Sequence, residues 1–80
     1  MKPRLGKVLR VQFNVVFIFE EGENGREYAF ALDKIEGYCG ERLRELKQFG
    51  KKGLTEGVLL KFFADEEHKV VSVHPLVFRV

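Results

Sequence analysis

The chain has 80 residues, which is enough for one domain (residues 1–80) with a small hydrophobic core. It carries 14 Lys and Arg residues against 12 Asp and Glu residues, and the net charge of +2 is too small to indicate a nucleic-acid-binding protein by itself. No apolar run approaches the roughly 20 residues that span a bilayer, so no membrane partner is expected.

The residues that report on cellular location favour the cytoplasm. Cys39 is the only cysteine and cannot form an internal disulfide, which is typical of a reducing compartment. The first ten residues, MKPRLGKVLR, lack the apolar core of a signal peptide. We therefore expect a cytoplasmic protein.

The first strand is predicted over residues 6–13, where polar and apolar residues alternate. One side of this strand carries Leu9, Val11 and Phe13, and the other carries Val8, Arg10 and Gln12. Asn14 interrupts the pattern. The β-branched and aromatic residues 15–19 then predict a second strand.

A hairpin is predicted after residue 19. Asn24-Gly25 is the signal of a type I′ turn, and residues 28–32 return as the partner strand. From Val11 to Phe19 only Gln12 and Asn14 are polar, so the second strand is apolar on both faces. The second strand could therefore be buried on both sides, be covered by another part of the chain, or expose one face to a binding partner.

A short amphipathic helix is predicted over residues 41–49, after a turn at residues 33–35. Leu43, Leu46 and Phe49 recur at a spacing of three, and Gly50 is placed to end the helix. Residues 58–63 and 69–73 predict two further strands around the turn ADEEH. Pro75 argues against a continuation in the middle of a sheet, and residues 76–78 stay unplaced.

The element order is three strands, a helix and two strands, without parallel-type alternation. It predicts a mainly β fold, a five-stranded antiparallel OB-type barrel with one short helix between strands 3 and 4 that plugs one end. An SH3-like barrel would not need this helix. An α+β sheet with the helix packed on it, covering Phe17, remains an alternative.

Three segments resemble the cold-shock domain, a small OB-type barrel that binds single-stranded RNA or DNA. They are GKVLRVQFN (6–14), FIFEEGENGREYAFALDKI (17–35) and LTEGVLLKFFADEEHKVVSV (54–73), about two thirds of the chain. The chain departs from the family where bases would stack, because Val15, Ala29, Ala31 and Leu32 stand at family aromatic or histidine positions. Arg10 stands where the family has an outward Trp.

The resemblance implies which side chains point inward. Val16 and Ile18 face the core with Tyr28 and Phe30 beside them. Outward are Val15, Phe17 and Phe19, and opposite these lie Ala29 and Ala31. This arrangement would leave a shallow apolar patch on the outside.

The resemblance, with basic and aromatic residues at suitable positions, implies a non-enzymatic module that binds single-stranded nucleic acid, with RNA favoured over DNA. The candidate binding residues are Lys7, Arg10, Gln12, Phe17, Phe19, Lys34 and Lys61. The alternative is a protein-interaction or regulatory module that uses the apolar patch around Val15, Phe17 and Ala29. A weak homodimer through that patch is a further expectation.

No residue pattern predicts catalysis or a cofactor. His68 lies in an acidic turn and His74 precedes a proline, and no Ser or Cys stands in a recognisable nucleophile motif. No Cys/His set has the spacing of zinc ligands. Charge is segregated, however, with one basic cluster comprising Arg42, Arg44, Lys47, Lys51 and Lys52.

Overall fold

The structure is a computed structural model that describes residues 2–22 and 25–76. Its five strands are β1 (Arg4–Gln12), β2 (Val15–Glu20), β3 (Glu27–Ala31), β4 (Leu59–Ala64) and β5 (Val70–Pro75). All four neighbouring pairs are antiparallel, and the order across the sheet is β3-β2-β1-β4-β5. This confirms the predicted mainly β, five-stranded antiparallel fold.

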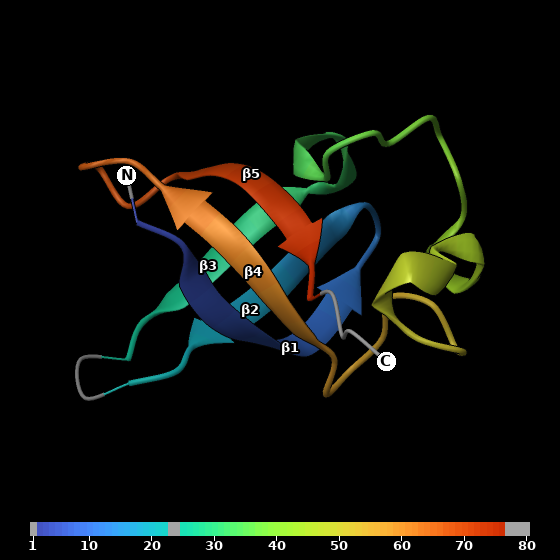
Figure 1. Ribbon diagram of the computed structural model, residues 1–80, viewed down its shortest axis with the longest axis horizontal. Helices are drawn as coiled ribbons and strands as arrows, with labels where there is room; N and C mark the ends of the chain where they lie inside the picture. Colours follow the sequence, from blue (N-terminus) through green and yellow to red (C-terminus); the bar gives the residue numbers. More distant parts are fainter. Residues whose placement is uncertain (1, 23–24, 77–80) are drawn as a thin grey trace.

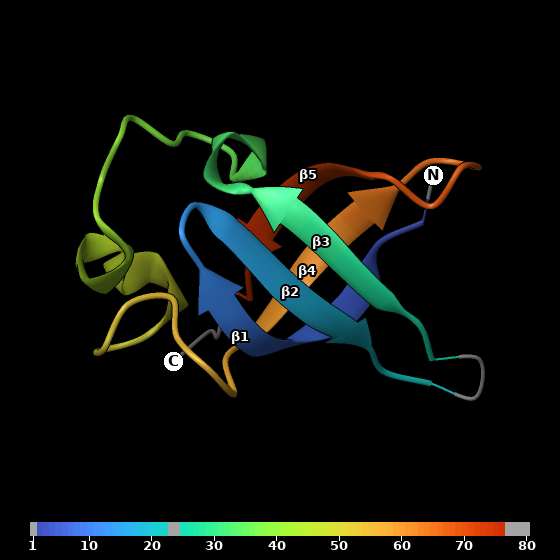
Figure 2. The same ribbon diagram turned by 180° about the vertical axis from the view of Figure 1, so that it is seen from behind.

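The sheet curls strongly into a half-barrel. In Figures 1 and 2, β4 and β5 lie on one side of the molecule and β2 and β3 lie on the other, with β1 joining them. The two ends of the sheet meet where Ile35, just after β3, forms an isolated parallel bridge with Val73 of β5. The Glu36 N–H also donates to the Val73 carbonyl oxygen (3.0 Å). These contacts bring the two edge strands together, which is compatible with a β-barrel fold.

The core lies inside the curl and follows the alternation of the strands. Val16 pairs with Phe30 and Ile18 pairs with Tyr28, and all four side chains are buried. The predicted inward and outward sides of β2 and β3 are therefore confirmed. Phe62 of β4 is fully buried and packs on Tyr28, with 5.0 Å between the ring centroids.

A bulge in β1 changes which of its side chains point inward. Val8 pairs with Ile18 but Arg10 pairs with Phe17, so Leu9 is an extra residue. The bulge reverses the alternation. Val8 and Val11 therefore both face the core while Arg10 points outward, and the predicted sharing of a side by Val8 and Arg10 is wrong.

The segment between β3 and β4 differs from the predicted α-helix. After the 3-10 turn η1 (Leu32–Lys34), it forms two more 3-10 turns, η2 (Leu43–Glu45) and η3 (Lys47–Phe49). Leu46 joins them with ψ 67, which no helix adopts. A strict spacing of three matches the 3.0 residues per turn of a 3-10 helix better than 3.6.

This segment, residues 36–57, is called the insert. It lies at one end of the half-barrel, on the right in Figure 1. Leu46 is fully buried and Phe49 nearly so, and both belong to the same core as the strands. The insert thus covers an end of the barrel, as predicted, although its helical part is two short turns.

Gly53 fixes the shape of the insert. It is buried with φ +77, and the neighbouring Leu54 N–H donates to the Leu43 carbonyl oxygen (2.9 Å). A Cβ atom at position 53 would overlap that oxygen and lie 2.6 Å from the Arg44 Cα. Only glycine lets residues 51–54 pass this close to η2.

Gly53→Ala should therefore lower the free energy of unfolding by at least about 2 kcal/mol, because backbone strain and a backbone overlap add together. Urea unfolding followed by circular dichroism measures this loss. Gly57→Ala is the matched control, since Gly57 has φ +89 but nothing within 4 Å of its added Cβ. Equal losses in the two variants would show that the close approach at Gly53 does not matter.

Several predicted boundaries shift at the C-terminal half. β5 extends to Pro75, which is tolerated because β5 is an edge strand in the order of the sheet. The predicted type I′ turn at Asn24-Gly25 involves Asn24, which lies outside the described residues, as do residues 77–80. Within the described ranges, no helix has the length and apolar character needed to cross a membrane.

Candidate functional site

The face of β1, β2 and β3 that points away from the core is called the outer face, and Figure 2 shows the molecule from this side. Its rows follow the strand register. They are Lys7–Phe19–Glu27, Arg10–Phe17–Ala29 and Gln12–Val15–Ala31. Five of the seven predicted binding residues therefore share this surface.

The other two predicted residues lie elsewhere. Lys34 is in η1, beyond the end of β3. Lys61 is on β4, where it pairs with Leu5 and His74, two strands away from β2. The structure thus separates Lys34 and Lys61 from the central rows of the outer face.

Arg10 lies directly over the ring of Phe17. The guanidinium carbon is 4.1 Å from the ring centroid, and Arg10 Nη2 donates to Glu27 Oε1 (3.2 Å). The insert residues Leu46 and Phe49 belong to the core, so the cover on Phe17 is Arg10 and not a packed helix. The alternative in which a helix covers Phe17 is therefore wrong.

The Arg10 cover is weakly held. The side chains of Arg10 and Glu27 are 49% and 47% exposed, and an exposed ion pair contributes about 0–1 kcal/mol. The exposed cation–π contact adds about 0.5–1 kcal/mol. A flat ligand that stacks on Phe17 can therefore displace Arg10 at low cost.

Phe13, which was predicted to end the first strand, lies instead in the turn that follows it. It forms the two-residue turn between β1 and β2 with Asn14, and it is 97% exposed at φ 56. Positive φ is unusual for a bulky side chain. The sequence does hold a signal for this turn. A two-residue loop between two strands usually needs a positive φ, and Asn14 is a residue type that such loops favour.

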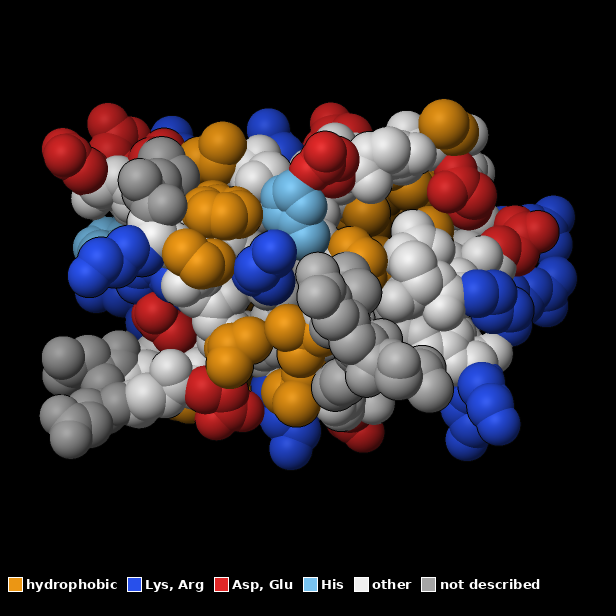
Figure 3. All heavy atoms as spheres, in the orientation of Figure 1, with side chains coloured by type: hydrophobic (Ala, Val, Ile, Leu, Met, Phe, Trp, Pro, Cys, Tyr) orange, Lys and Arg blue, Asp and Glu red, His pale blue; other side chains and the backbone are white. Residues whose placement is uncertain are grey.

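A groove joins the outer face to the insert. Its lining consists of Arg10, Val11, Leu43, Arg44, Lys52, Leu54, Thr55 and Glu56. Three cations therefore meet one carboxylate over partly apolar walls. Figure 3 shows Lys and Arg side chains gathered at the end of the molecule formed by the insert, and acidic ones gathered at the opposite upper corner.

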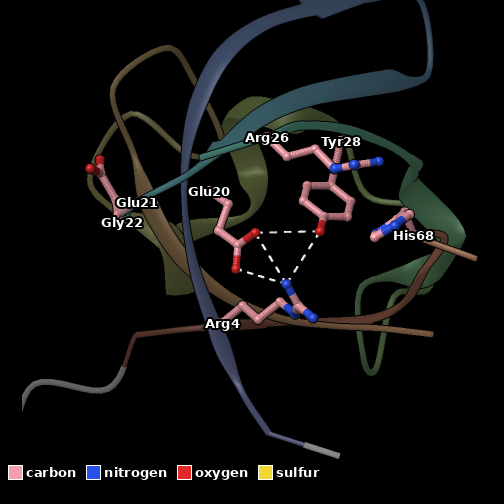
Figure 4. Close-up of a pocket in the computed structure, with 7 residues that line it drawn as sticks. All are labelled: Arg4, Glu20, Glu21, Gly22, Arg26, Tyr28 and His68. Carbon is pink, nitrogen blue, oxygen red and sulfur yellow. Dashed lines mark hydrogen bonds and ion pairs between the residues drawn. The ribbon is translucent and has the colours of Figure 1, made fainter. Parts of the chain in front are cut away.

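A second pocket lies near the open end of the half-barrel, between the starts of β1 and β3 (Figure 4). It is lined by Arg4, Glu20, Glu21, Gly22, Arg26, Tyr28 and His68. Arg4 Nη1 donates to Glu20 Oε2 (2.9 Å) and to Tyr28 Oη (3.3 Å), and the Tyr28 hydroxyl donates to Glu20 Oε1 (3.3 Å). This network links the ends of three strands, and within it Arg4 is already paired with Glu20.

His74 contacts two polar side chains, and sequence reasoning missed this arrangement. Its Nδ1 is 2.8 Å from Glu36 Oε2 and its Nε2 is 3.3 Å from Ser72 Oγ. The order resembles nucleophile, base and orienting carboxylate. Glu36 is 69% exposed, however, and Phe63 packs edge-on against the imidazole at 5.6 Å. The backbone N–H of Glu36 also donates to the Val73 carbonyl oxygen. We therefore interpret the contacts of His74 as a support for the place where the two ends of the sheet meet.

The described residues hold no group of three His, Cys, Asp or Glu side chains arranged to bind a metal ion. Comparisons with models of known protein families, with curated proteins and with solved structures give no match.

Proposed function

We propose that this protein is a non-enzymatic module that binds single-stranded nucleic acid, with RNA as the favoured form, on the outer face. The observation that carries this proposal is the position of Arg10. It lies over the Phe17 ring and also lines the groove with Arg44 and Lys52. An aromatic surface and a set of cations thus adjoin through one residue.

Binding of a single strand without base pairing needs these two elements together. Phosphate contacts supply the salt-dependent part of the affinity, and each stacked base adds about 1–3 kcal/mol. Phe17 and Phe19 present rings on β2, and Lys7 and Arg10 present cations on the neighbouring β1. Ala29 opposite Phe17 is small, so it does not block a base over that ring.

The fold supports the same surface by analogy. OB-type barrels bind oligonucleotides on the face of strands 2 and 3. The segments 6–14, 17–35 and 54–73 resemble the cold-shock domain, whose ligands are single strands. The rings and cations of the outer face supply the chemical groups that such binding needs.

The test is fluorescence anisotropy with labelled single-stranded RNA and DNA of about ten nucleotides, a length within the range that OB-folds cover. We expect binding at low salt that weakens as salt rises, and weaker binding of the matching duplex. No binding of any single strand at low salt would exclude this function.

A protein-interaction module is the second candidate, and Phe13 favours it. Phe13 is almost wholly exposed, and the apolar residues Val15 and Ala31 follow on adjacent strands at this corner of the outer face. Light scattering distinguishes a homodimer through this corner from a monomer. A dimer that Phe13→Ser converts to monomer, with no oligonucleotide binding, would favour this second candidate.

A further inference from the structure

The groove between β1 and the insert is a candidate site that the outer-face residues alone do not explain. Arg44 lies in η2, Lys52 lies beside Gly53 on the segment that passes close to η2, and Arg10 comes from β1. Within the described part of the chain, neither Arg44 nor Lys52 forms an ion pair. The groove therefore presents cationic groups to a ligand from outside the protein.

The backbone around the groove is well fixed. The Leu54 N–H donates to the Leu43 carbonyl oxygen (2.9 Å), which holds the Lys52 side of the groove against the Arg44 side. The Gly57 N–H donates to the Val8 carbonyl oxygen and the Val8 N–H donates to the Val58 carbonyl oxygen, both at 2.9 Å. These bonds attach the end of the insert to β1, two residues before Arg10. A fixed arrangement of cations reduces the ordering cost of binding.

We propose that this groove holds a backbone phosphate of the single strand whose base stacks on Phe17. The proposal rests on the function proposed above and adds a subsite to it. Arg44 offers a planar set of donors that matches phosphate oxygens, and Lys52 adds a compact positive charge. The apolar side chains Leu43 and Leu54 lie beside them and weaken competition by water.

Arg10 couples the two parts of this site. A base that stacks on Phe17 takes the place of the Arg10 guanidinium, which is held there only by exposed contacts. Because Arg10 also lines the groove, the displaced guanidinium remains next to the phosphate subsite. The insert thereby extends binding from the strands to the end of the barrel.

The double variant Arg44→Gln/Lys52→Gln tests the subsite by the salt dependence of anisotropy titrations. For single strands the slope of log K against log salt falls by about 0.7 for each phosphate charge that the protein no longer neutralises. Because the groove holds one phosphate, we expect a decrease of about 0.7. Relative to about 1 M salt, this slope corresponds to roughly 5-fold weaker binding at about 0.1 M salt. Glu56→Gln, which removes the carboxylate of the groove, should strengthen binding.

The matched control is Arg42→Gln/Lys51→Gln. It removes the same two charges from exposed positions of the same insert, outside the groove lining. We expect this control to retain most of the wild-type slope. Equal decreases in slope in both double variants, or no decrease in Arg44→Gln/Lys52→Gln, would overturn the subsite while the proposed function stands. A wild-type protein that binds no single strand would overturn the proposed function and the subsite with it.

Discussion

Replacing Leu46 with alanine should lower the free energy of unfolding by about 2–5 kcal/mol, the usual cost of truncating a buried leucine. Leu46 belongs to no strand, yet its side chain is fully buried and packs in the core shared with the sheet. The loss should therefore report on the attachment of the insert to the barrel. Urea unfolding with circular dichroism and fluorescence detection measures it, with Cm compared at constant m-value.

Leu59→Ala is the matched control for Leu46. It deletes the same atoms from a residue that is 45% exposed on β4, and surface substitutions usually change stability by about 0.5 kcal/mol or less. A Leu46 variant that loses no more than the Leu59 variant would show a loosely attached insert. The groove would then form only when a ligand binds.

The strands could be predicted because local composition specifies them. Residues 15–19 are β-branched or aromatic, and the observed β2 differs from the prediction only by the addition of Glu20. The inward positions of Val16 and Ile18 follow from the period of two once one face is assigned to the core. No residue in this segment disfavours a strand, so local preference and tertiary packing agree here.

The bulge at Leu9 could not be predicted from alternation, because an extra residue on one strand is visible only against its partner. Its consequence is large for the site. Without the bulge Arg10 would share a side with Val8 and point to the core, whereas in the structure it lies on Phe17. The placement of Arg10 outside was expected only from the resemblance to the cold-shock domain, not from the periodicity.

The groove could not be predicted either, since its cations are far apart in the sequence. Arg10, Arg44 and Lys52 meet because the insert folds back on β1, and Gly53 makes that path possible. The strict spacing of three in Leu43, Leu46 and Phe49 was interpreted as one amphipathic helix, although it equals the period of a 3-10 helix. Sequence patterns do not show how such short turns are oriented. The basic cluster could be recognised in the sequence. Which of its residues line the groove, and which face solvent, could not.

Phe17→Ala should weaken binding of single-stranded oligonucleotides by about 1–3 kcal/mol, which is about 5- to 150-fold in Kd. The ring is the one on which Arg10 now stacks, and it faces away from the core, so its removal should change stability much less than Leu46→Ala does. Anisotropy titration at low salt measures the affinity.

Arg10→Ala should in addition flatten the salt dependence by about 0.7 in slope, since one phosphate then has no cation from this position.

Phe63→Ala is the control that separates stacking on the outer face from a general loss of aromatic surface. Phe63 is a partly buried phenylalanine on β4 that packs against His74, away from the β2 rings. We expect its truncation to leave oligonucleotide binding unchanged. If Phe17→Ala binds as well as wild type while it abolishes the binding of a protein partner or a dimer, the outer face serves a protein partner. If both variants lose affinity equally, the bases do not stack at Phe17, because a specific stack depends on the position of one ring.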